Sequence, residues 1–89
     1  MQGGLEEYWR QRVQRARAVY LNASAQHTGA TNELGQGLIA PADGSFAVAS
    51  ARRAEALALH ELERTMWIYA DLVANGKLPP PDEDEKLLV

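Results

Sequence analysis

Residues 45–76 form the longest uninterrupted helical pattern in the chain and constrain the fold more than any other feature. This stretch contains no proline, its only glycine is its last residue, and Ala, Leu, Glu and Arg, which favour helices, dominate it. Asp43 and Ser45 offer N-cap oxygens at its start, while Asn75-Gly76 and Pro79 form a stop signal at its end. We therefore expect a helix at about 45–76, a rod of roughly 45 Å.

The apolar residues of this helix predict which side faces the core. At about 100° per residue they fall on one broad face. The spacing typical of a bundle seam, alternating three and four, is followed by Leu59, Leu62, Met66, Tyr69 and Val73. We expect this set to form the core of the fold.

The N-terminal third predicts a second helix at about residues 5–34. Its last part is rich in Ser, Thr, Asn and Gly, which leaves two interpretations open. The helix either ends at Thr28-Gly29 or continues weakly to residue 34. Residues 35–44, with two Gly, a Pro and an Asp-Gly pair, form the connection.

Two helices joined by a short connection fold back on each other, so the sequence predicts an all-α, antiparallel two-helix hairpin over residues 1–78. A turn near residue 40 makes the numbers of facing residues add to roughly 80. This places His27 opposite residues 52–55. Residues 79–89 combine three prolines with four acidic residues, and we expect them to form a disordered acidic tail.

Composition excludes several classes of function. The chain has 89 residues and no cysteine, which excludes disulfides and thiolate metal sites and fits a reducing compartment. No apolar run approaches the ~18 residues of a membrane span, and the N-terminus lacks a signal-peptide layout. The net charge of −3 lies in residues 79–89, so the body is nearly neutral. We expect a cytoplasmic protein without a membrane association.

A single hairpin of this size usually needs a further source of stability, and Trp67 suggests one. Trp67 projects away from the expected core, and an apolar patch around a Trp is typical of an interface. We expect a homodimer in which two hairpins form a coiled-coil-like four-helix bundle. The candidate interface residues are Trp67, Ile68, Leu57 and Trp9. The alternative is that Trp67 lies beneath the connection or the tail.

Polar residues suggest two further hypotheses. Glu55 projects into the apolar face, where a carboxylate must be paired or protonated, and His27 is its expected neighbour. The pair is a candidate metal site, or else an ion pair that fixes the helix register. DNA binding would have to use the arginines of the first helix, but these scatter around its axis. They are Arg10, Arg12, Arg15 and Arg17.

The sequence contains no phosphate-binding loop and no layout for a nucleophilic triad. We therefore expect no enzyme and no cofactor. The favoured function is a small structural or protein-interaction module that self-associates or docks on a larger protein through its helix faces. A metal-binding helical bundle and a small DNA-binding regulator are the alternatives.

Overall fold

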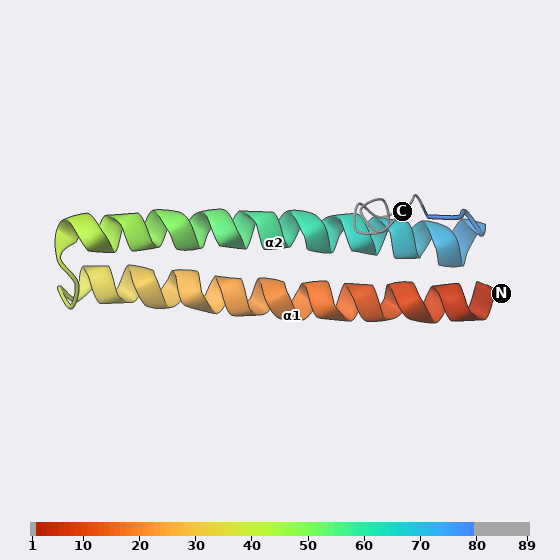
Figure 1. Cartoon of the computed structure of the whole chain (residues 1–89), viewed down its shortest axis with the longest axis horizontal. Helices are drawn as coiled ribbons and strands as arrows, with labels where there is room; N and C mark the ends of the chain where they lie inside the picture. The colour runs from red at the N-terminus through yellow and green to blue at the C-terminus, as the bar shows by residue number, and fades with distance from the viewer. Residues whose placement is uncertain (1, 80–89) are drawn as a thin grey trace, which may run out of the picture.

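The computed structural model describes residues 2–79 and contains two helices. Helix α1 spans Gln2–Gly35 and helix α2 spans Pro41–Asn75. They run side by side in opposite directions, so that the N-terminal end of α1 lies beside the C-terminal end of α2 (Figure 1). No strand occurs within residues 2–79, which confirms the all-α two-helix fold. The acidic tail prediction lies, beyond Pro79, outside the described residues.

The helix boundaries decide between the two interpretations of α1 and correct the predicted start of α2. Helix α1 continues through Gly29, as one long helix. Helix α2 begins at Pro41 with Ala40 as its N-cap and without a side-chain cap. The expected caps, Asp43 and Ser45, lie inside the helix instead, and the connection shortens to residues 36–40. Proline suits this position because it has no N–H group to leave unsatisfied in the first turn.

A glycine in the left-handed conformation follows the end of each helix. Gly37 has φ 72° and Gly76 has φ 65°, values that glycine adopts without steric penalty. After Gly37, the N–H group of Leu38 donates to the carbonyl of Glu33 at 3.0 Å. After Gly76, the N–H group of Lys77 donates to the carbonyl of Asp71 at 3.3 Å. These bonds satisfy carbonyls that a helix end leaves open, and they confirm the stop signal predicted at Asn75-Gly76.

The seam between the helices is shifted by one position from the one predicted. Its buried residues on α2 are seven or fourteen apart: Gly44, Ala58, Thr65 and Leu72. On α1 the buried residues are also seven apart: Trp9, Ala16 and Ala23. Two residues expected in the core lie outside it, since Leu59 is 39% exposed and Met66 is 52% exposed. Val73 is also exposed, and Leu62 and Tyr69 are half-buried.

Small residues explain this shift, because they let the two backbones approach closely. A Cβ atom added to Gly44 would lie 2.5 Å from Cδ1 of Leu34, so a larger residue there would require the leucine side chain to move. Thr65 is fully buried, and its hydroxyl donates to the carbonyl of Leu62 at 3.0 Å. Its polar atom is thereby satisfied within the seam. Helix α2 therefore packs against α1 through the side that carries its small residues, Gly44, Ala58 and Thr65.

Neither α1 nor α2, over the residues described, combines the length and the apolar character needed to cross a bilayer.

Candidate functional site

A row of exposed apolar side chains runs along α2 beside the seam. Leu59, Met66 and Val73 each follow a buried seam residue by one position and are seven residues apart. Met66 also lines an open hollow together with Glu63, Trp67 and Ala70. Trp67 is 71% exposed at the outer edge of this row. Exposed apolar side chains that gather in one place mark interaction surfaces.

Helix α1 extends this row across the hairpin. The contacts of His27 with Glu55 and of Leu34 with Gly44 show that residues at the same level have numbers that add to about 80. Val13 therefore lies level with Met66, and Leu21 with Leu59.

Ser24 identifies the side of α1 on which these residues lie. It hydrogen-bonds Glu55, the residue four positions before Leu59. Val13 precedes Ser24 by three helical turns, which places it on the same side of α1. Leu21, three residues before Ser24, is its neighbour on that surface. We call the combined surface the apolar face, defined by Val13, Leu21, Leu59, Met66 and Val73, with Ala70 and Trp67 at its edge.

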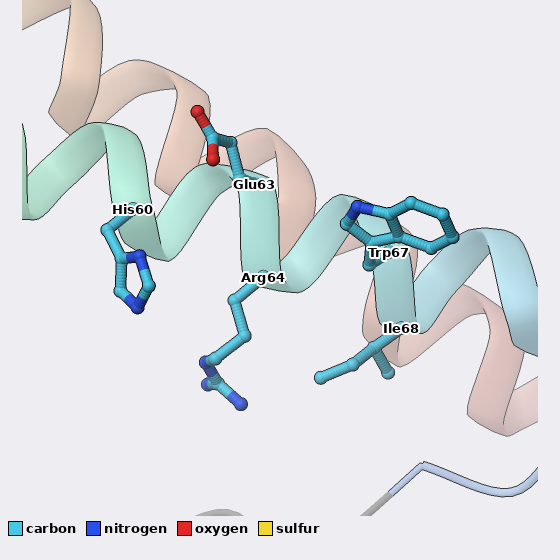
Figure 2. Close-up of a pocket in the computed structure, with 5 residues that line it drawn as sticks. All are labelled: His60, Glu63, Arg64, Trp67 and Ile68. Carbon is cyan, nitrogen blue, oxygen red and sulfur yellow. The ribbon is translucent and has the colours of Figure 1, made fainter.

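A second open hollow on α2 lies next to the first and shares Glu63 and Trp67 with it. Its other lining residues are His60, Arg64 and Ile68. Figure 2 shows Glu63 leaving the helix on one side, and His60, Arg64 and Ile68 leaving it on the other. Ile68 is half-buried and lines a further hollow with Leu78 and Pro79, because the chain turns back along α2 after Gly76. Ile68 is therefore less accessible than Trp67.

The structure separates the four residues expected at an interface. Trp67 and Leu57 are exposed, and no described residue of the connection or of the chain after Gly76 buries Trp67. Leu57 precedes Met66 by nine residues, which is two and a half helical turns, so it lies on the opposite side of α2. Trp9 is 2% exposed and belongs to the core of its own hairpin. It is therefore removed from the candidate interface.

Glu55 and His27 meet in the loop-side half of the hairpin, as their positions predict. The Nδ1 atom of His27 donates to Oε1 of Glu55 at 3.0 Å. Hydrogen bonds from Ser24 and from His27 hold the pKa of the Glu55 carboxyl below the ordinary range of glutamate. A structural zinc ion takes four ligands, and no group of three metal-binding side chains occurs among the described residues. The pair joins the helices as a cross-link of fixed register.

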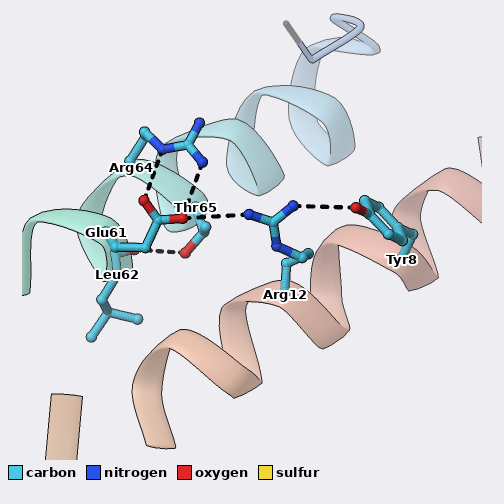
Figure 3. Close-up of polar contacts among 6 residues, drawn as sticks. All are labelled: Tyr8, Arg12, Glu61, Leu62, Arg64 and Thr65. Carbon is cyan, nitrogen blue, oxygen red and sulfur yellow. Dashed lines mark hydrogen bonds and ion pairs between the residues drawn. The ribbon is translucent and has the colours of Figure 1, made fainter. Parts of the chain in front are cut away.

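A second polar network joins the helices near their other end (Figure 3). Arg12 donates to the Tyr8 hydroxyl at 3.2 Å and to the Glu61 carboxylate at 3.4 Å. Its guanidinium also lies 5.0 Å from the centre of the Trp9 ring, a cation–π distance. Arg64 donates to the same Glu61 from Nε and Nη2, at 3.1 and 3.0 Å. The side chain of Arg12 is therefore engaged in contacts within the hairpin.

The remaining arginines of α1 divide into two groups. Arg10 pairs with Glu7 at 2.6 Å on the same helix. Arg15 and Arg17 are exposed, and within residues 2–79 they form no hydrogen bond or ion pair. Two of the four arginines thus already face carboxylates within the hairpin, which leaves no concentrated basic stripe of the kind that tracks a phosphate backbone.

Protein-family models, curated proteins and solved structures were each compared with this chain, and none of them matches it.

Proposed function

We propose that this chain is a small interaction module that self-associates, two hairpins joining through their apolar faces into a four-helix bundle. The observation that supports the proposal is that small residues fill much of the buried seam, while several large apolar side chains are exposed. Among the described residues, the buried apolar positions are three alanines, Trp9 and Leu72. Several larger apolar side chains of α2 are exposed instead, namely Phe46, Leu57, Leu59, Met66, Trp67 and Val73.

Hydrophobic stabilisation scales with buried apolar area, so the three alanines of the seam each contribute little. A domain of about 80 residues has a small margin of stability even with a full core. Covering the apolar face by a second copy adds buried area without any change in the hairpin. Because only folded chains associate, a higher protein concentration shifts the equilibrium towards the folded dimer and raises its melting temperature.

The same surface suits docking on a larger protein, and that outcome would appear as a monomer with a concentration-independent melting temperature. A reducing compartment suits a chain without cysteine, and we extend the proposal to the cytoplasm on that ground. The hollows on α2 are open and shallow rather than enclosed, so we propose no catalytic role for them.

Light scattering coupled to size exclusion tests this proposal. Twice the chain mass of 9.8 kDa is expected at micromolar concentration. Met66→Glu places a charge in the middle of the apolar face and should yield a monomer that remains helical by circular dichroism. Leu57→Glu is the matched control, since the same substitution on the opposite side of α2 should leave the dimer intact. A wild-type chain that stays monomeric at every concentration would contradict self-association.

A further inference from the structure

We infer that the occupant of the apolar face is a second copy of this chain, related by a two-fold axis parallel to the helices. In this arrangement α2 of each hairpin packs on α1 of the other, and both connections lie at the same end. The inference rests on the proposed function and adds to it the orientation of the partner and the residues that meet.

The symmetry axis itself fixes which residues face each other. Rotation about an axis along the hairpin moves no residue along its length, so residues at one level stay at that level. Across the interface, as within the hairpin, facing positions of α1 and α2 then have numbers that add to about 80. Leu59 faces Leu21 of the second copy, and Met66 faces its Val13.

The charged residues on this face provide a second, independent argument for the same arrangement. Arg17 lies one turn from both Val13 and Leu21, and Glu63 lies one turn from both Leu59 and Met66. Each helix therefore carries an apolar, charged, apolar stripe on this face, with opposite charges in the middle. Arg17 and Glu63 are exposed, and neither forms a hydrogen bond or ion pair within the described hairpin.

The two-fold axis turns this pattern into two identical contacts. Arg17 of each copy lies level with Glu63 of the other, between two pairs of apolar side chains. Figure 2 shows Glu63 leaving α2 on the side away from Arg64, so its carboxylate is directed away from the Arg64–Glu61 pair. Complementary charges at the edge of an interface select orientation and register more than they add affinity.

The other face-to-face arrangement turns the second hairpin end for end. It places α1 on α1 and α2 on α2, so that the Arg10–Arg17 stretch meets its own copy and Glu63 approaches Glu63. Like charges brought together across an interface are destabilising. The same apolar side chains are covered in both arrangements, and the charges decide between them.

The apolar match is densest in the half of the hairpin that carries the chain ends. Beyond Leu59 towards the connection, this side of α2 carries the half-buried Val48 between polar residues, and this side of α1 carries Ser24 and Thr28. The polar residues of α2 there are Ser45, Arg52 and Glu55. The polar residues there fit a looser, hydrated contact. A standard interface buries about 800 Å² per partner. The apolar face from Leu59 to Val73 is about 21 Å long and two helices wide, so it supplies part of that area and the loop-side half supplies the rest.

Charge reversal at the two positions tests the inference. Arg17→Glu alone and Glu63→Arg alone each convert two attractive pairs into two repulsive ones, and each should raise the dimer Kd about tenfold at low ionic strength. The double variant restores opposite charges and should return the Kd to within about threefold of the wild type. Arg15→Glu is the matched control, two residues away on α1 and facing another direction, and should leave the Kd unchanged.

A mixture of the two single variants provides a second measurement that does not depend on the double variant folding. Each variant alone repels itself, but an Arg17→Glu chain and a Glu63→Arg chain attract each other at both contacts. Sedimentation should therefore show association restored in the mixture. Circular dichroism verifies that each chain remains helical.

The outcomes separate this inference from the proposed function. Weakened single variants with rescue in the double variant and in the mixture support the arrangement. A wild-type dimer whose Kd is unchanged by either single variant overturns the arrangement, because in the end-for-end dimer each reversal exchanges one like-charge pair for another. A wild-type chain that is monomeric at all concentrations overturns both.

Discussion

Replacement of Leu72 by alanine tests whether the seam lies where the structure places it. Leu72 is 1% exposed and is the larger of the two fully buried side chains, whereas the neighbouring Val73 is exposed. The substitution removes three carbons, each worth about 0.8 kcal/mol, which gives about 2.4 kcal/mol from transfer alone. The cavity adds to this loss, although two helices can close part of it, so we expect a total of about 3 kcal/mol.

Thermal denaturation followed by circular dichroism measures this loss. For a domain of this size, 3 kcal/mol corresponds to a fall of roughly 12–24 °C in Tm. Leu57→Ala is the matched control, since it removes the same atoms from an exposed position of α2 and should change stability by less than about 0.5 kcal/mol. Measurements at several protein concentrations separate the hairpin from its association. Equal losses in Leu72→Ala and Leu57→Ala would refute the seam described here.

Two further predictions concern pH and glycine. Because the pKa of Glu55 is lowered in the folded chain, its stabilising effect is present above the ordinary glutamate pKa of about 4.3 and is lost as the pH falls through the folded value. Glu55→Gln should flatten that part of the stability–pH curve, and an unchanged acid limb would contradict the role of its hydrogen bonds. Gly76→Ala should destabilise by about 1–2 kcal/mol because its φ is 65°. Gly29→Ala, at an open helical position, should instead stabilise by up to about 1 kcal/mol, and melting curves showing the same sign for both would refute this reading.

The sequence predicts the hairpin well because its strongest signals are local. The stop at Asn75-Gly76 and the lack of helix breakers after Ser45 are features of the chain itself. The contact between His27 and Glu55 also follows, since a short connection leaves only one antiparallel register. Gly29 misleads because a single glycine costs about 1 kcal/mol, less than the packing of α1 against α2 returns.

The seam is harder to predict because it depends on the distance between the two helix backbones. Hydrophobicity favours Leu59 and Met66 for the core, but the helices approach through Ala58 and Thr65, which are small enough to let them. Helical periodicity alone does not show which of two sets of residues, Ala58, Thr65 and Leu72 or Leu59, Met66 and Val73, faces α1. Trp9 shows the same limit, since its size suits an interface as well as a core, and only its burial in the folded hairpin places it in the core.

The three buried alanines of the seam, Ala16, Ala23 and Ala58, also affect how the hairpin responds to temperature. Alanine has no side-chain rotamers to lose on burial, so closing the seam costs little conformational entropy. The heat capacity of unfolding follows the apolar area that becomes exposed, and a seam of small residues exposes little of it. The stability curve of one hairpin is therefore shallow. In the proposed dimer the covered apolar face adds to the heat capacity of unfolding, so the stability curve of that dimer should bend more strongly with temperature.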